Sequence, residues 1–291
     1  MRVKEYYPRL SRIVGRKMTA YLALVRPFTL APPIFVGVFL TIAKMGFDFE
    51  AVTRGVYAGL TLAFAQACGQ VVNQVADREL DKIVKPYRPI PQGIVTVEEA
   101  IGLAWLLALL AVARSFTISI YFGLMTSLML FFAVFYSLPP LSPRRVNPWL
   151  NHFWVSFSRS VLPFLAVMEV DGWRYAILAF AWAFGWQATK DVPDIEGDRR
   201  FGIKTIANTY GVRAVKLLAV GGTIIYTVLA VVWRLWIFLL NVPLAVYGLL
   251  RFEGRWRGEN TVAWMAFYVG LGATAVYPLI HEVIIHSVYK L

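Results

Sequence analysis

The chain has 291 residues, of which 58% are hydrophobic and 16% are charged, and its mean hydropathy is +0.60. A soluble domain carries about 25% charged residues and could not bury this much apolar surface, so the composition excludes a soluble globular protein. The formal net charge of +12 would suit a nucleic-acid partner. In a membrane protein it is explained more simply by basic loops that face anionic lipid and an anionic substrate, so we expect a bilayer and no nucleic acid as partner.

The N-terminal segment, residues 1–17, is basic and lacks an apolar core followed by a cleavage site. We therefore expect no cleavable signal peptide. Cys68 is the single cysteine, so no internal disulfide bond can form, and its apolar surroundings predict a buried thiol.

A helix needs about 20 mostly apolar residues to cross a bilayer. Long apolar stretches recur along the whole chain and predict an all-α, polytopic membrane helix bundle. About nine transmembrane helices are expected, at residues 19–43, 52–76, 95–113, 116–136, 149–168, 173–189, 213–233, 235–250 and 261–285.

The order of these stretches predicts a single membrane-embedded domain, residues 1–291, with two four-helix halves. The halves are residues 19–136 and 149–250, and the helix at 261–285 is added at the end. Most of the 29 lysines and arginines fall in alternate connections between the stretches. The positive-inside rule then places the N-terminus, and the two acidic motifs described next, on the cytoplasmic side of a cell membrane.

The first acidic motif ends the second apolar stretch and consists of Asn73, Asp77 and Asp81. These residues are four apart, so they share one face of a helix. Carboxylates gathered on one face repel each other unless a cation lies between them. Hard oxygen ligands of this kind suit Mg²⁺, which is commonly shared with substrate phosphates.

Residues 85–93 follow the first motif, are basic, and contain three prolines. Proline restricts its own backbone and that of the preceding residue, so this segment cannot form a regular helix. A rigid basic loop beside the acidic residues is suitable for capping a diphosphate. A stiff connector without a binding role is the alternative.

Further positive charges and an aromatic residue lie close to the predicted cytoplasmic face or within the predicted helices. Tyr136, Arg144 and Arg145 follow the fourth stretch. Arg26 and Arg159 fall inside stretches, where charges are costly and by default face a site or a partner. Snorkelling would also explain Arg26, and an ion pair with an acidic residue on a helix would also explain Arg159.

The second acidic motif ends the sixth stretch and consists of Asp191, Asp194 and Asp198, which share a face if the helix continues past Pro193. One acidic cluster at a helix end is usually a solvated surface. Here both motifs end apolar helices and both are followed by basic residues, so together they favour a site for a magnesium diphosphate.

These residues resemble the UbiA superfamily of membrane prenyltransferases. The resemblance rests on the two acidic motifs, on Arg88-Pro89-Ile90-Pro91 after the first, and on Gly202-Ile203-Lys204-Thr205 after the second. It covers essentially the whole chain, and the motifs are specific in combination. One position departs from the family pattern, because Gln74 stands where the family commonly has Asp, and this puts the exact metal shell in doubt.

The resemblance implies a bundle around a central cavity, with a cytoplasmic cap, that transfers a prenyl group from an isoprenyl diphosphate to a lipophilic acceptor. It implies Mg²⁺ held by Asn73, Asp77, Asp81, Asp194 and Asp198. Phosphate or substrate contacts are implied for Arg26, Arg78, Arg88, Arg145, Arg199 and Lys204. Catalytic roles are implied for Asp191, which positions or deprotonates the acceptor, for Lys190 at the leaving diphosphate, and for Tyr136 facing the allylic cation.

The acceptor is left open between an aromatic quinone-type precursor, which we favour, and geranylgeranylglyceryl phosphate of ether-lipid synthesis. The three scattered histidines give no pattern for haem farnesylation. From another class, a cation-coupled transporter would also use paired acidic helix ends. Transporter carboxylates lie near the midplane with few arginines beside them, which does not match these motifs.

Overall fold

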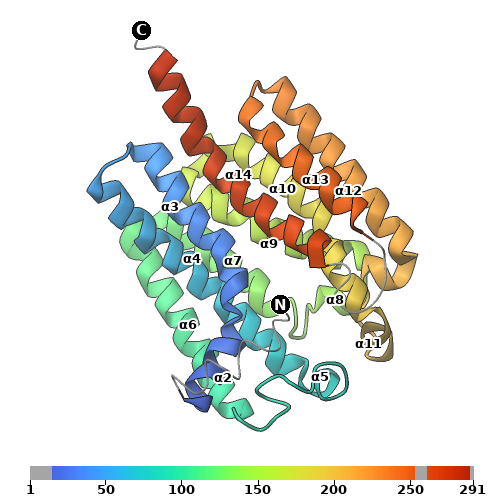
Figure 1. Ribbon diagram of the computed structural model, residues 1–291. Helices are drawn as coiled ribbons and strands as arrows, with labels where there is room; N and C mark the ends of the chain where they lie inside the picture. Colours follow the sequence, from blue (N-terminus) through green and yellow to red (C-terminus); the bar gives the residue numbers. More distant parts are fainter. Residues whose placement is uncertain (1–14, 253–260, 289–291) are drawn as a thin grey trace.

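The computed structural model describes residues 15–252 and 261–288, and every regular element in this part of the chain is helical (Figure 1), as the composition predicts. The longer helices are α2 (Arg16–Val25), α3 (Ala31–Met45), α4 (Phe49–Ala76), α6 (Val97–Ile118), α7 (Ile120–Phe135), α9 (Pro148–Met168), α10 (Trp173–Trp186), α12 (Ile206–Val232), α13 (Asn241–Leu250) and α14 (Thr261–Val288). The shorter elements are α5 (Arg78–Val84), α8 (Pro143–Val146), α11 (Ile195–Arg200) and the 3₁₀ segments η1 (Pro27–Leu30), η2 (Glu169–Gly172), η3 (Gln187–Asp194) and η4 (Trp236–Leu240).

Six helical segments of the described residues are long and apolar enough to cross a membrane. They are Pro27–Met45, Phe49–Ala76, Val97–Ile118, Pro148–Arg200, Ile206–Val232 and Ala263–Val283. The fourth of these contains both α9 and α10, and two shorter apolar helices occupy residues 120–135 and 236–250. Every predicted range therefore overlaps a helix, whereas the number of nine crossings stays a prediction.

The first predicted range, residues 19–43, is not one helix. Helix α2 ends at Val25, Arg26 adopts a left-handed backbone with φ of 50°, and Pro27 begins η1. Proline disfavours a helical conformation in the residue before it, which explains why the chain turns here. The break brings Arg26 to the end of the bundle where the first acidic motif lies.

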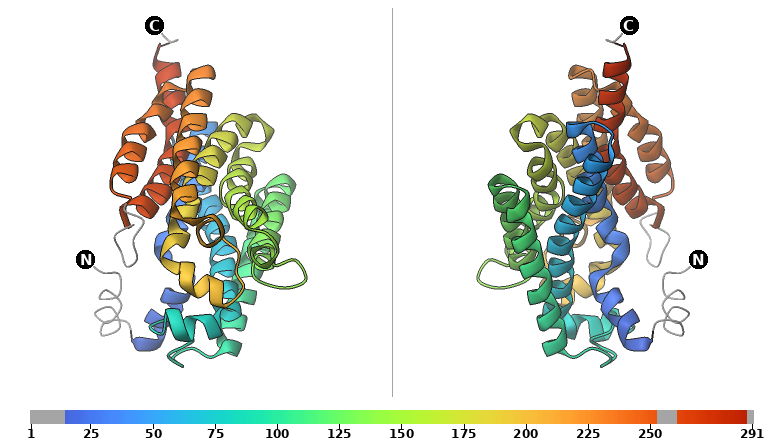
Figure 2. Two further views of the ribbon diagram at one scale, coloured as in Figure 1. Left: turned by 90° about the vertical axis from the view of Figure 1, so that its right-hand side faces the viewer. Right: turned by 90° about the vertical axis from the view of Figure 1, so that its left-hand side faces the viewer.

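The long helices form a closed bundle, as the contacts between neighbouring helices and the views in Figures 1 and 2 show. Helix α3 packs on α4, α4 on α6 and α7, α7 on α9, and α9 on α10. Helix α10 packs on α12 and α14, and α14 returns to contact α3. The short helices α5, α8 and α11 lie toward one end of this bundle, and α5 contacts α11 there.

Glycines allow two very close helix crossings. A Cβ atom added to Gly37 of α3 would lie 2.1 Å from the backbone nitrogen of Gly59 in α4, and one added to Gly222 of α12 would lie 2.4 Å from Cα of Gly185 in α10. Small residues at such contacts let helix backbones approach, which is how helices associate in lipid. One crossing involves α4 and the other α10, the helices that lead into the two acidic motifs.

Candidate active site

The first acidic motif lies where α4 ends and α5 begins. Asn73, one turn before the end of α4, donates from Nδ2 to Oδ2 of Asp77 at 2.9 Å and to the Ser137 hydroxyl at 3.2 Å. Its Oδ1 accepts from Nη2 of Arg26 at 3.4 Å. Arg26 also donates to Gln70 at 2.9 Å, so the broken first span positions this arginine beside the motif.

Asp77 is held by Arg144 of α8. The Nη1 atom of Arg144 donates to Asp77 Oδ2 at 2.8 Å, and Nη2 lies 2.7 Å from Oδ1. Arg144 is only 2% exposed, and within the described residues its Nε and Nη2 atoms have no aligned acceptor. A buried guanidinium with donors to spare is suited to receive further anionic oxygens.

The arginine that contacts Asp77 is Arg144, whereas the resemblance implies a substrate contact for its neighbour Arg145. Ser142 adopts a left-handed backbone with φ of 33°, and the four-residue helix α8 that follows directs Arg144 inward. Arg145, the next residue, is exposed at the surface.

Asp81, on α5, is the most buried carboxylate of the motif, at 2% exposure. It forms an ion pair with Arg88 of the loop 85–93, whose turns are irregular as its prolines predict. The pKa of Asp81 is raised because burial disfavours the charged form, and the positive charge of Arg88 opposes this shift. The ion pair fixes the proline-rich loop over the end of α5.

The second acidic motif lies on a different backbone. Helix α10 ends at Trp186 and the chain continues as the 3₁₀ segment η3, which contains Pro193, before α11 begins. Asp191 accepts from Nζ of its neighbour Lys190 at 2.7 Å. Asp198 is 8% exposed and forms no ion pair with any described residue.

The two motifs meet through Lys85 and Asp194. Nζ of Lys85, which directly follows α5, lies 2.6 Å from Oδ2 of Asp194 at the end of η3. The sequence assigns no individual role to Lys85. Its position at the start of the basic loop 85–93 is the sequence feature that could have indicated a role in the site.

Tyr136 lies between the motifs, at the end of α7. Its ring centroid is 5.5 Å from Cζ of Arg144, and its hydroxyl has Lys190, Asp191 and Asp198 as charged neighbours.

Three predicted substrate residues bind backbone carbonyl groups and, within the described residues, form no ion pair with a carboxylate of either motif. Arg78 is exposed, donates to the Val75 carbonyl at 3.3 Å, and lies 3.5 Å from Oε1 of Glu79, which belongs to neither motif. Arg199 donates from Nη2 to the Asn208 carbonyl at 3.0 Å. Lys204 is exposed and donates from Nζ to the Val146 carbonyl at 3.1 Å.

Gln74 faces away from the motif that contains it. Its side chain is 2% exposed and donates from Nε2 to the carbonyl of Leu24, near the end of α2, at 2.6 Å. The departure from the family pattern therefore fastens α2 to α4. No group of three or more His, Cys, Asp or Glu side chains in the described residues is arranged to hold a metal ion. Most carboxylates of the motifs are paired with basic side chains.

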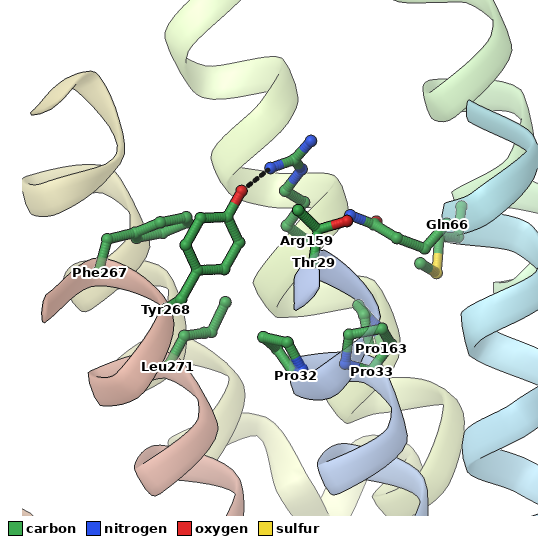
Figure 3. Close-up of a pocket in the computed structure, with 10 residues that line it drawn as sticks. Thr29, Pro32, Pro33, Gln66, Arg159, Pro163, Phe267, Tyr268 and Leu271 are labelled. Carbon is green, nitrogen blue, oxygen red and sulfur yellow. Dashed lines mark hydrogen bonds between the residues drawn. The ribbon is translucent and has the colours of Figure 1, made fainter. Parts of the chain in front are cut away.

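A small cavity lies among η1, α3, α4, α7, α9 and α14 (Figure 3) and has a volume of about 10 Å³, room for about one water. Arg159 donates to the Tyr268 hydroxyl at 3.3 Å and, within the described chain, forms no ion pair with a carboxylate. The ion pair that would have explained its burial is thus not formed. Gln66 and Thr29 line the same cavity.

Comparisons with known proteins show the family of the chain. The profile of the UbiA prenyltransferase family matches residues 30–276. Chlorophyll synthase of Avena sativa is 30% identical over 223 residues, which are 69% of this chain and 57% of that protein. The chain thus spans less than two thirds of this relative. Digeranylgeranylglyceryl phosphate synthase of Methanobrevibacter smithii is 26% identical over 72% of this chain and 75% of its own length.

The fold also has a solved counterpart. A structure of a UbiA homologue from Archaeoglobus fulgidus, bound to GPP and Mg²⁺, superimposes with a TM-score of 0.67. The match covers 89% of this chain and 98% of the other at 22% identity, so it concerns the fold alone.

Proposed function

Because the chain belongs to the UbiA prenyltransferase family, we propose that it transfers a prenyl group from an isoprenyl diphosphate to a lipophilic acceptor with the help of Mg²⁺. The observation that carries this proposal is the ion pair of Lys85 with Asp194, which brings the two acidic motifs to one end of the bundle. By the positive-inside argument this end faces the cytoplasm.

The donor set fits a magnesium diphosphate. The metal would be held by Asn73, Asp77, Asp81, Asp194 and Asp198, which offer hard oxygen atoms of the kind Mg²⁺ prefers. Asp77, Asp81 and Asp194 are at present neutralised by Arg144, Arg88 and Lys85. These carboxylates would be free to hold the metal once Arg144, Arg88 and Lys85 turned to the phosphate oxygens of a magnesium diphosphate.

When bound, Mg²⁺ lowers the barrier to departure of the diphosphate by neutralising charge on the leaving oxygens. Arg144 serves the same end with its Nε donor, which has no acceptor among the described residues, together with Arg26 and Arg88. The bond between prenyl C1 and the bridging oxygen breaks, and C1 bonds to the acceptor. The electron-rich ring of Tyr136 faces the developing cation, and Asp191 takes the proton that the acceptor loses.

The preferred acceptor is an aromatic quinone-type precursor. Most arginines near the motifs would bind the donor diphosphate, which leaves few positive side chains to bind a second phosphate. A second candidate is geranylgeranylglyceryl phosphate, and one observation favours it. Arg159 lies in the cavity of Figure 3 without an ion pair and is an electrostatic neighbour of both Arg26 and Lys190. It offers a positive charge to an acidic acceptor.

Binding of a thiolo-diphosphate analogue of the donor tests the metal site. We expect tight binding with Mg²⁺ and weak binding with EDTA, because the acidic motifs alone repel the anion. Equal affinity in both conditions would contradict a bridging metal.

Acceptor profiling tests the reaction itself. Membranes with the protein receive labelled geranylgeranyl diphosphate and homogentisate, 4-hydroxybenzoate, dihydroxynaphthoate or geranylgeranylglyceryl phosphate. We expect product with an aromatic acceptor. Product solely with the glyceryl phosphate would select the second candidate, and Arg159→Gln should then reduce that activity more than Arg145→Gln. Saturable ion flux without any transfer would favour a transporter.

A further inference from the structure

A groove of about 530 Å³ lies on the side of the bundle, between the neighbouring helices α10 and α12 and beside the start of α9. Its volume falls in the range of cavities that hold small molecules, about 300–1,000 Å³. The residues that form its walls are apolar, and they include Phe180, Phe184, Leu217, Leu218, Ile225 and Leu229.

Glycines explain why the groove is open. Gly185 and Gly222 bring α10 and α12 into close contact, while Gly221, which also lines the groove, points no side chain into it. A Cβ atom added to Gly221 would meet nothing within 4 Å. Leu217 and Ile225 on the rim are 66% and 55% exposed, so in a bilayer the groove opens toward lipid.

One end of the groove has the chemistry of a membrane interface. Trp149 donates from Nε1 to the hydroxyl of Tyr210 at 3.1 Å, and both residues line the groove while remaining about half exposed. Tryptophan and tyrosine are enriched where the hydrocarbon core meets the lipid headgroups. This end therefore lies at headgroup depth.

Positive charges are placed at the same end. Lys204 is anchored through Nζ to the carbonyl of Val146, three residues before Trp149. Arg213 is exposed, forms no ion pair within the described residues, and precedes Leu217 by one helical turn, so it lies above the groove face of α12. Both cations can reach an anionic headgroup.

We propose that this groove binds one anionic phospholipid, with an acyl chain between α10 and α12 and its phosphate at Lys204 and Arg213. The prenyl donor is a poorer occupant, because no carboxylate of either acidic motif lines the groove. Phe184 lines it two residues before α10 ends, so a bound chain packs against the helix that leads into the second motif.

Native mass spectrometry of the purified, delipidated protein tests the proposal by titration with phosphatidylglycerol or phosphatidylcholine. We expect one tightly retained phosphatidylglycerol and weaker retention of phosphatidylcholine. Gly221→Leu should abolish that retention because the new side chain fills the groove, and leucine favours a helix interior more than glycine does. Gly102→Leu is the matched control, since Gly102 is another helical glycine with open space, on α6.

Arg213→Gln separates the headgroup contact from the acyl chain. It should weaken phosphatidylglycerol binding about five-fold, the effect of one basic residue near an anionic headgroup, and leave phosphatidylcholine binding unchanged. Undiminished phosphatidylglycerol binding in a folded Gly221→Leu protein would overturn the proposal. Displacement of the phospholipid by geranylgeraniol at equal concentration would also overturn it and identify an isoprenoid as occupant. These readouts do not depend on prenyl transfer.

Discussion

The two acidic motifs present similar residues on different backbones. The first continues a regular helix, α4, into α5, and its aspartates are paired with arginines of low side-chain exposure, Arg144 at 2% and Arg88 at 14%. The second follows a 3₁₀ segment, and its pairs are with lysines, at 23% exposure for both Lys85 and Lys190. Arginine binds carboxylate through a rigid planar fork, whereas lysine offers a point charge on a flexible stem. The first motif is therefore the fixed side of the site and the second the adaptable side.

The largest expected effect comes from Asp77→Ala and Asp194→Ala. Each should reduce turnover about 1,000-fold, because each removes a ligand that acts on transition-state charge. Their stabilities should differ. Loss of Asp77 leaves Arg144 as a buried, unpaired charge, which costs about 3–5 kcal/mol, whereas Lys85 can turn to solvent for less than about 1 kcal/mol when Asp194 is lost.

Turnover is measured with labelled donor, and stability is measured by thermal unfolding in detergent. Equal losses of stability in both variants would break the comparison between a fixed and an adaptable motif. Near-normal turnover in either would remove that residue from the metal site.

Substitutions at two neighbouring arginines should have the next largest effect on turnover. Arg144→Gln should reduce turnover about 100-fold, since it removes donors aimed at the leaving diphosphate. Arg145→Gln is the control, and as a surface change it should alter turnover less than about two-fold. Steady-state kinetics of the two purified variants measure this, and equal effects would contradict the assignment of Arg144.

The link between the motifs should have a smaller effect. Lys85→Met removes the contact with Asp194 and one cation near the diphosphate, and we expect KM for the donor to rise about ten-fold, or about 1.4 kcal/mol. Lys82→Met is the control, because Lys82 is exposed on α5 and pairs only with Glu79 among the described residues. Identical KM values in both variants would separate Lys85 from the site.

The smallest effect concerns the connections after each motif. Residues 201–205 are already fastened, since the Lys204 amide donates to the Arg144 carbonyl at 2.6 Å and Thr205 forms a capping box with Asn208. Hydrogen exchange with Mg²⁺ and donor analogue should therefore show a larger gain in protection for residues 85–93 than for 201–205. An unchanged pattern in both segments would count against a cap.

The sequence predicted the all-helical class, the approximate positions of most helices, and the irregular proline-rich loop, because apolar runs and prolines act locally. The break at Arg26 inside the range 19–43 was not predicted. It did not predict which of two adjacent arginines turns inward, since a left-handed Ser142 decides between Arg144 and Arg145. The sequence also did not predict the ion pair of Lys85 with Asp194, because tertiary packing brings these residues together from distant parts of the chain. The same limit applies to Gln74, whose partner lies on α2.

The glycine crossings restrict how this protein can move. Since Gly37 lies against Gly59 and Gly185 against Gly222, α3 with α4 and α10 with α12 are packed backbone against backbone, and we expect each pair to move as one unit. We then expect a conformational change on substrate binding to act at hinges beyond the crossings. The available hinges are the helix ends at Asp77 and Gln187, which would swing α5 and α11 while the bundle stays still.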